Sequence, residues 1–188
     1  LKKMDYRIIS GLKGDTNWNE TLTGINIVVH CASRVHVMNE TAADPLVIFR
    51  EVNVEGTVRL ARQAADSGVN KFIYISSIKV NGESTKGHPF KADDKPAPED
   101  PYGISKWETE QALQKIAAET ELEVVIIRPP LVYGPGVRAN FLRLMKMVHL
   151  GVPLPLGAIH NQRSLVALDN LVDLIVTCMN HSAAVNQI

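Results

Sequence analysis

Phe72-Ile73-Tyr74-Ile75 places four apolar side chains in succession, without the alternation of polar and apolar positions that marks a half-buried strand. A strand with this pattern is buried on both faces, which is typical of a parallel sheet covered by helices on either side. Val124-Val125-Ile126-Ile127 repeats the pattern further along the chain. We therefore predict that both segments are strands of a parallel sheet.

Amphipathic stretches separate the apolar runs and give the order β-α-β-α-β-α. The expected strands cover residues 25–30, 71–76 and 123–128, and the expected helices cover residues 46–67, 102–120 and 139–150. This order predicts an α/β fold with a doubly wound, Rossmann-like parallel sheet. A sheet of this kind that binds a dinucleotide normally opens with a strand and a glycine-rich turn, and neither is found. We therefore expect that the first strands and this turn are missing and that the chain is an internal fragment.

Three segments with polar groups or tight backbone stand at the carboxyl ends of the expected strands. They are residues 30–33, Ser76-Ser77 and residues 128–130. In doubly wound sheets, ligands bind in the crevice beyond the carboxyl ends of the strands. The sequence therefore predicts a site at this edge of the sheet.

Tyr102 and Lys106 are four residues apart in a stretch with helical character, so both side chains reach the same spot. A phenol with a pKa of about 10 is a poor base at neutral pH, whereas a neighbouring cation favours the phenolate. We expect Lys106 to lower the pKa of Tyr102. The pair indicates a proton-transfer site of the oxidoreductase type.

The composition favours a globular protein with a small-molecule partner. The chain has 188 residues, of which 45% are hydrophobic, and 20 basic residues balance 20 acidic ones without a basic stripe that would attract nucleic acid. No apolar run approaches the roughly 20 residues of a spanning helix, so we expect a cytoplasmic protein without membrane contact. Cys31 and Cys178 lie outside any metal-ligand pattern, which predicts buried thiols and no metal site.

Seven blocks of the sequence occur in a fixed order. They are Gly14-Asp15, Val28-Val29-His30-Cys31-Ala32, Asn53-Val54-Glu55-Gly56-Thr57, Tyr74-Ile75-Ser76-Ser77 with Gly82, Tyr102 with Lys106, Arg128-Pro129-Pro130 with Val132-Tyr133-Gly134-Pro135-Gly136, and Arg163 with Leu165-Val166 and Asp169. In this order they resemble the extended short-chain dehydrogenase/reductase family, specifically its NAD-dependent nucleotide-sugar epimerases, dehydratases and ketoreductases. The resemblance implies that residues 1–133 and 164–188 form part of an NAD(P)-binding Rossmann domain. Residues 134–163 would begin the sugar-nucleotide-binding region.

The resemblance implies a catalytic triad of Ser77, Tyr102 and Lys106. Tyr102 would act as the base or acid on a sugar hydroxyl, and Lys106 would hold the nicotinamide ribose. The Ser77 hydroxyl would hydrogen-bond the reacting oxygen and position it.

The same resemblance implies cofactor contacts at Asp15, Ala32 and Pro129, besides Tyr102 and Lys106. Asp15 would contact the adenine, whereas Ala32 and Pro129 would line the nicotinamide side. A solvated turn at Asp15 and a rigid turn at Pro129 are the alternatives from the residues alone. NAD is the expected cofactor, with NADP left open.

Substrate contacts are expected at Ser77, Asn140 and Arg163. Asn140 and Arg163 would meet the diphosphate, since a guanidinium fork suits phosphate oxygens. The alternative for both is an ordinary surface residue. Asn53 matches a helix asparagine of the family, which we interpret as structural.

Three functions are compatible with these residues. The favoured one is an NAD-dependent 4-epimerase of a UDP-hexose, which oxidises C4 transiently; the second is an NAD(P)H-dependent 4-ketoreductase of a UDP-4-keto-6-deoxy sugar. The third, a non-catalytic nucleotide-binding sensor, is disfavoured by the intact triad. Dehydratases and decarboxylases of the family that the chain resembles carry acidic residues directly after the catalytic hydroxyl residue, so Ile78 and Lys79 argue against a 4,6-dehydratase or a sugar-acid decarboxylase. The resemblance also implies a homodimer that serves polysaccharide biosynthesis, with the exact sugar left open.

Overall fold

The computed structural model describes residues 8–9, 11–35, 44–85, 87–137, 139–153, 158, 160 and 162–188, with the side chains of residues 139 and 140 excepted. The chain forms two compact units, Leu1–Arg128 with Cys178–Ile188, and Pro129–Thr177. Each unit contains one parallel sheet among its described residues.

Three parallel strands form the sheet of the first unit. They are β1 (Ile27–His30), β2 (Lys71–Ile75) and β3 (Glu123–Ile127), in the order β1-β2-β3. His30 pairs with Tyr74, and Ile75 pairs with Ile127, so the carboxyl ends of all three strands meet at one edge. The predicted parallel sheet is confirmed.

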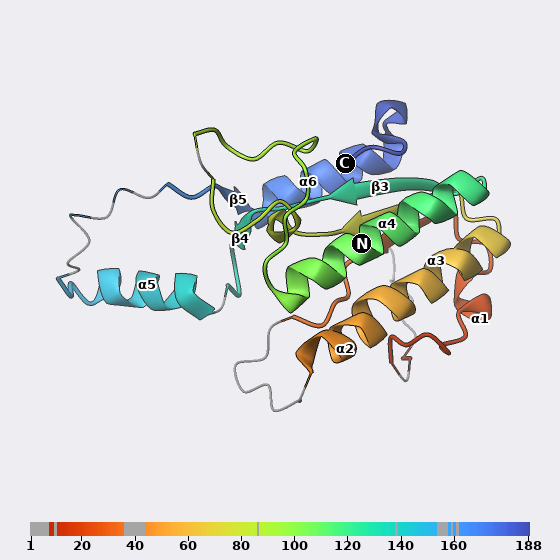
Figure 1. Ribbon diagram of the computed structural model, residues 1–188, viewed down its shortest axis with the longest axis horizontal. Helices are drawn as coiled ribbons and strands as arrows, with labels where there is room; N and C mark the ends of the chain where they lie inside the picture. The colour runs from red at the N-terminus through yellow and green to blue at the C-terminus, as the bar shows by residue number, and fades with distance from the viewer. Residues whose placement is uncertain are drawn as a thin grey trace. The chain divides into compact units, whose positions relative to one another are not determined.

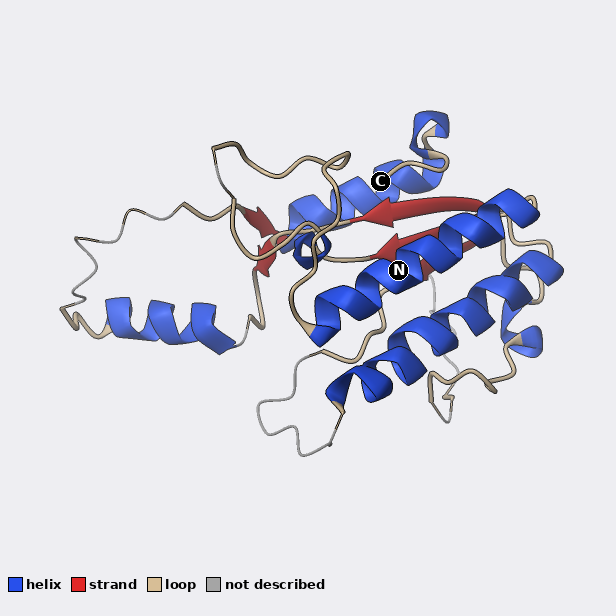
Figure 2. Ribbon diagram, viewed as in Figure 1, coloured by secondary structure: helices blue, strands red, loops and turns tan. Residues whose placement is uncertain are grey.

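Helices of the first unit precede, connect and follow these strands. They are α1 (Asn19–Leu22), α2 (Pro45–Phe49), the π-helical segment η1 (Arg50–Glu55), α3 (Gly56–Asp66), the short 3-10 helix η2 (Ile78–Val80), α4 (Pro101–Glu119) and the 3-10 helix η3 (Ser182–Ala184). Elements α2, η1 and α3 follow one another without a break, which matches the single helix predicted for residues 46–67. Helices α3 and α4 lie side by side along the sheet (Figure 1, with strands in red in Figure 2).

The core of the first unit lies between this helix pair and one face of the sheet. It is built from Trp18, Leu22, Leu60, Ala61, Ala64, Val69, Phe72, Tyr74, Leu113, Ile116, Leu122, Val124 and Ile126. On the opposite face, Ile73 and Val125 are also buried, with 0% and 3% of their surface exposed. Burial on both faces explains the uninterrupted apolar runs, and the predicted Rossmann-like class is confirmed.

Lys71 begins β2 with a charged group on that second face. Its Nζ donates to the carbonyl oxygens of Cys178 and Met179, both at 3.3 Å, and lies 3.5 Å from a carboxylate oxygen of Glu123. The two carbonyls belong to the last turn of α6 (Leu168–Asn180), where backbone acceptors lack partners within the helix. Lys71 thus connects the end of this helix to the centre of the sheet.

The second unit contains β4 (Leu131–Tyr133), α5 (Ala139–His149), β5 (Leu165–Ala167) and most of α6. Its two strands are parallel, and α6 begins directly after β5. Several apolar side chains of α5 are exposed, among them Leu144, Met145 and Val148. The predicted domain limits at residues 134 and 164 stay a prediction.

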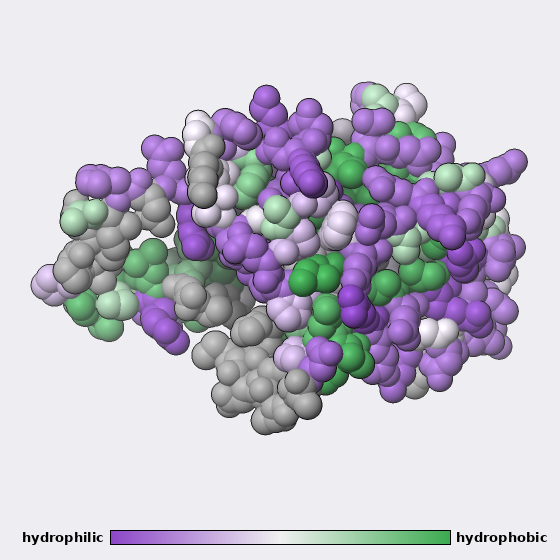
Figure 3. Space-filling view, viewed as in Figure 1, coloured by the Kyte–Doolittle hydropathy of each residue, from purple (hydrophilic) through white to green (hydrophobic). Residues whose placement is uncertain are grey.

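The surface in view over α3 and α4 is mostly hydrophilic (Figure 3). Within the described residues, no helix has both the length and the apolar character to cross a membrane. Cys178 is buried as expected, but the expectation for Cys31 is wrong, because this thiol is exposed just beyond the end of β1.

We predict that Gly56→Ala destabilises the fold. A Cβ at Gly56 would lie 2.8 Å from Leu12 Cγ and 3.0 Å from the Leu12 backbone, so the turn before α1 would have to move away from α3. Even with the helix preference for alanine, the free energy of unfolding should fall by about 1–2 kcal/mol. Urea unfolding measures this, with Gly11→Ala as the control, because a Cβ at Gly11 meets nothing within 4 Å. Equal losses in the two variants would contradict the prediction.

Candidate active site

Helix α4 carries Tyr102 and Lys106, and its first residues fix where the helix starts. Asp100 is the N-cap, and its Oδ1 accepts a hydrogen bond from the Gly103 N–H at 2.6 Å. Pro101 follows at the first helical position, where its missing N–H costs nothing. Tyr102 and Lys106 therefore stand on successive turns of the same helix face, as the sequence predicts.

Ser77 lies just beyond the carboxyl end of β2. Its Oγ accepts a hydrogen bond from the Lys79 N–H at 3.3 Å and caps η2. The hydroxyls of Ser77 and Ser33 both lie close enough to the Tyr102 phenol to act toward lowering its pKa. The structure thus brings Ser77 and Tyr102 together and adds Ser33, which follows β1.

The pKa of Tyr102 is raised above its ordinary value. Burial is the largest cause, followed by the negative charge of Asp100, whereas Ser77, Lys79 and Ser33 act in the opposite direction. The expectation that Lys106 lowers this pKa is therefore wrong in this structure. The Lys106 Nζ lies 5.7 Å from the centroid of the Tyr102 ring, and its hydrogen bond goes elsewhere.

Lys106 is a buried cation, with 2% of its surface exposed. Its Nζ donates to the carbonyl oxygen of Ile75 at 2.8 Å and lies 4.6 Å from the centroid of the Tyr74 ring. Burial lowers its pKa to about 8, although Glu110 and Cys31 act in the opposite direction. The ammonium thus stands at the carboxyl end of β2 and gives up its proton more readily than that of an ordinary lysine.

Asn53 connects three parts of the site through its side-chain amide. Its Oδ1 accepts from the Ser33 hydroxyl at 3.0 Å and the Arg34 N–H at 2.8 Å, and its Nδ2 donates to the Arg34 carbonyl at 3.1 Å and Ser105 Oγ at 3.0 Å. Ser105 in turn donates to the Tyr102 carbonyl at 2.8 Å. Asn53 therefore holds the segment after β1 against α4, which agrees with its structural interpretation. It lies in η1, and π-helical turns frequently accompany functional sites.

His30 ends β1 beneath the site. Its Nε2 shares a hydrogen bond of 2.9 Å with Thr57 Oγ1, and its ring packs against Phe72 and Tyr74. Burial, and secondarily Lys106, lowers its pKa to about 4. His30 is therefore neutral at physiological pH and contributes packing contacts but no charge to the site.

The predicted cofactor contacts outside the triad lie in three places. Asp15 is exposed in a turn next to the start of α3, Ala32 is exposed in the segment after β1, and Pro129 is the first residue of the second unit. Their cofactor roles stay predictions. Of the predicted substrate contacts, Asn140 and Arg163 lie in the second unit, where Arg163 is exposed before β5 and the Asn140 side chain lies outside the described residues. Their substrate roles also stay predictions.

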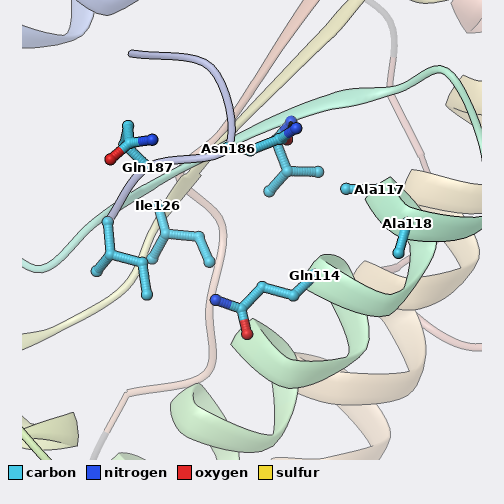
Figure 4. Close-up of a pocket in the computed structure, with 8 residues that line it drawn as sticks. Gln114, Ala117, Ala118, Ile126, Asn186 and Gln187 are labelled. Atoms are coloured by element: carbon cyan, nitrogen blue, oxygen red, sulfur yellow. Dashed lines mark hydrogen bonds between the residues drawn. The ribbon is translucent and has the colours of Figure 1, made fainter. Parts of the chain in front are cut away.

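A separate hollow lies between α4 and the end of the chain (Figure 4). It is lined by Gln114, Ala117, Ala118, Val124, Ile126, Asn186, Gln187 and Ile188, and includes none of Ser77, Tyr102 or Lys106. Ile126 N–H donates to the Gln187 carbonyl at 3.0 Å beside it. In the described part of the chain, no group of three or more His, Cys, Asp or Glu side chains is arranged to hold a metal ion.

Comparison with known proteins agrees with this geometry. Residues 7–188 match the NAD dependent epimerase/dehydratase family. The chain belongs to this family. The predicted membership among the nucleotide-sugar epimerases and dehydratases is confirmed, and the triad stands at the sheet edge where the fold places its ligands.

Individual relatives of this epimerase/dehydratase chain act on nucleotide or lipid-linked sugars. The UDP-glucose 4-epimerase of Vibrio cholerae is 56% identical over 182 residues, which are 96% of this chain and 56% of that protein. The N-acetyl-alpha-D-glucosaminyl-diphospho-ditrans,octacis-undecaprenol 4-epimerase of Escherichia coli O157:H7 is 31% identical over 88% of this chain and 49% of its own length. The chain therefore spans about half the length of the curated relatives it matches.

A solved structure shows the same fold. UDP-glucuronic acid 4-epimerase from Bacillus cereus, in complex with UDP-glucuronic acid and NAD, has a TM-score of 0.77 and 26% identity to this chain. The match covers 91% of this chain and 55% of the solved one.

Ser33 and Tyr74 are site residues to which the sequence assigned no role. Ser33 belongs to the strand-end segment of residues 30–33, so its neighbourhood was predicted but not its hydrogen bonds. Tyr74 was assigned to the apolar strand. Its phenol is buried and its pKa is raised by burial, so the side chain is neutral and presents the ring face to Lys106.

We predict that Lys106→Met changes how stability depends on pH. The pKa of Lys106 is about 8 in the folded protein against 10.5 in the unfolded chain, so the unfolded state binds the proton more tightly between these values. The free energy of unfolding of the parent should consequently rise through this window, by up to about 3 kcal/mol, and the variant should lack this rise. Urea unfolding from pH 7.5 to 10.5 measures it. Lys115→Met, on the exposed side of α4, is the matched control and should keep the parental rise.

Proposed function

We propose that the protein is a UDP-hexose 4-epimerase that uses NAD as its bound cofactor. The observation that carries the proposal is the placement of Ser77, Tyr102 and the buried Lys106 at one edge of the parallel sheet. The 56% identity to the UDP-glucose 4-epimerase of Vibrio cholerae supports UDP-glucose and UDP-galactose as the first substrates to test.

The residues at the sheet edge fit a nicotinamide nucleotide. An ammonium group has three donors, and among the described residues Ile75 O is the one acceptor hydrogen-bonded to the Lys106 Nζ. The other N–H groups can therefore donate to the hydroxyls of a ribose. When bound, NAD would accept a hydride from C4 of the sugar and return it to the opposite face.

The side chains of the triad would move and hold the proton of the sugar hydroxyl. Ser77 hydrogen-bonds the 4-oxygen and holds it beside the Tyr102 phenol. Tyr102, as the phenolate, removes the hydroxyl proton as C4 is oxidised and gives it back to the oxygen when C4 is reduced. Lys106, with a pKa of about 8, is mostly protonated at pH 7, so a positive charge lies 5.7 Å from the centroid of the Tyr102 ring.

The residues after Ser77 support epimerisation over dehydration. Lys79 occupies the position where a dehydratase needs an acidic group, and its Nζ is bonded to Glu83 at 2.6 Å and Asp100 at 2.5 Å. A carboxylate for a second proton transfer is therefore not supplied at this position. Turnover measurements with defined substrates distinguish the epimerase from the 4-ketoreductase and from the non-catalytic sensor.

We further infer a cytoplasmic homodimer that supplies a sugar for polysaccharide biosynthesis. The exposed, unpaired thiol of Cys31 is compatible with a reducing compartment. The relative from Escherichia coli O157:H7 acts on a lipid-linked sugar, which supports a link to polysaccharide assembly. The dimer follows from the family resemblance of the helices at residues 53–65 and 107–118.

Proton NMR of the full-length protein with UDP-galactose, without added cofactor, tests the proposed reaction. We expect conversion to UDP-glucose, because the cofactor is reoxidised within each turnover and is not consumed. No conversion with UDP-galactose or UDP-N-acetylgalactosamine, followed by turnover of a UDP-4-keto-6-deoxy sugar with NADPH, would establish the ketoreductase instead. Binding of nucleotide without any turnover would establish the sensor.

We predict that Tyr102→Phe lowers kcat of the full-length epimerase by about a thousandfold, since general acid–base catalysis typically contributes 10²–10⁴-fold. The ring remains, so packing against Phe49 should persist. Initial rates at saturating UDP-galactose measure the loss, and NAD content and circular dichroism verify that the variant is folded and loaded. Unreduced turnover in a folded, loaded variant would show that Tyr102 is not the proton-transfer group.

A further inference from the structure

A buried ion pair adjoins the triad and has no part in the mechanism above. Arg128 Nε and Nη2 form a fork on the Glu110 carboxylate, with distances of 3.0 Å and 2.6 Å. The exposed fractions of the two side chains are 7% and 2%. Because burying two charges costs about as much as their attraction returns, such a pair contributes little net stability. Its presence calls for another explanation.

The pair connects several segments that surround the site. Ser76 Oγ donates to Glu110 Oε1 at 2.5 Å. Arg128 Nη1 donates to Asn81 Oδ1 at 3.3 Å and to the Ala92 carbonyl at 3.2 Å. The Glu110 carboxylate on α4 and the Arg128 guanidinium after β3 therefore join α4 to the ends of β2, β3 and η2 and to the segment around Ala92.

Glu110, the carboxylate of this unit, contacts the immediate neighbour of one proposed catalytic residue and lies one helical turn from another. Ser76 precedes Ser77, and its N–H donates to the Ile127 carbonyl at 2.7 Å, so its backbone and its hydroxyl are both fixed. Glu110 lies four residues after Lys106, one helical turn further along α4. A substitution at Glu110 is therefore expected to change the position of the backbone before Ser77 and the electrostatic potential at Lys106.

The other titratable groups around Lys106 are neutral at pH 7. His30, at the end of β1, has a pKa lowered to about 4, and burial raises the pKa values of Tyr74 on β2 and Tyr102 on α4. Partial desolvation also raises the pKa of the Cys31 thiol after β1, although this residue is exposed. Among the described residues, Glu110 is thus the carboxylate whose charge favours the protonated form of Lys106. The fork from Arg128 holds this carboxylate in one orientation.

We propose that Glu110 is a positioning residue for catalysis, which Arg128 holds in place so that Ser77 keeps its orientation and Lys106 keeps its proton in a buried site. The proposal rests on the proposed function of the triad. It predicts that loss of the Glu110 charge lowers kcat. It also predicts that, in a plot of kcat against pH, the fall in kcat on the basic side shifts to lower pH, whereas a merely structural role would leave this basic limb in place.

Glu110→Gln in the full-length protein tests this, with Glu108→Gln as the matched control. Glu108 lies two residues earlier on α4 and pairs with Arg50 at the surface, so its variant removes the same charge from the same helix away from Lys106. We expect kcat of Glu110→Gln to fall roughly tenfold at pH 7.5, with KM nearly unchanged, since remote positioning groups typically contribute factors of 10–100. The basic limb should shift for Glu110→Gln and stay in place for Glu108→Gln.

The double variant E110Q/R128Q covers the case in which the single variant does not fold. Two amides can keep hydrogen bonds to each other and to Ser76, and no unpaired charge is left buried. Because Glu110 is the group whose charge acts on Lys106, the basic limb of this variant should also shift to lower pH. A folded double variant whose basic limb coincides with that of the parent would overturn the proposal.

A readout without turnover separates this proposal from the proposed function. Carbon NMR of lysines labelled at Cε follows the titration of Lys106, whose signal is assigned by its loss in Lys106→Arg. A lower midpoint in the double variant supports the role of Glu110 even if the parent proves inactive on every UDP-sugar, in which case the epimerase assignment alone fails. An unchanged midpoint overturns the role of Glu110 whatever the activity.

Discussion

The burial of the Lys106 ammonium is the constraint on which the rest of the site depends. A buried cation must be surrounded by acceptors and negative charge, or it loses its proton. Here the Ile75 carbonyl, the face of the Tyr74 ring and the Glu110 carboxylate share that task. These interactions do not fully offset the cost of burying the charge, since the pKa of Lys106 still falls to about 8. The lysine is therefore poised to redirect its N–H groups toward a ligand.

The parallel sheet makes this arrangement possible. Because β1, β2 and β3 run in the same direction and in register, their carboxyl ends deliver His30, Ile75 and Ile127 to one edge. The segments that leave β1 and β2 there place Ser33 and Ser77 beside the Tyr102 side chain of α4. A site built from three strands and one helix needs no long loop to bring its groups together.

The sequence predicted those parts that depend on local pattern. Apolar runs identified strands buried on both faces, and the spacing of Tyr102 and Lys106 placed both on one helix face. It could not predict the pKa of Tyr102, which depends on burial and on the Asp100 cap. Nor could it predict the Glu110–Arg128 pair, whose members are 18 residues apart and meet only after β3 has joined the sheet. Spacing reports neighbours along one element, whereas these contacts arise from tertiary packing.

Lys71 has a consequence for the order in which the chain folds. Its ammonium sits at the start of the central strand, yet its carbonyl partners lie 107 and 108 residues later, at Cys178 and Met179. During synthesis, β2 and β3 are complete long before these acceptors leave the ribosome, and until then Glu123 is the partner left to this charge among its described contacts. Contacts of such long range slow folding and leave apolar sheet surface uncovered in the meantime. The charge at the start of β2 therefore gains its carbonyl partners only late in synthesis.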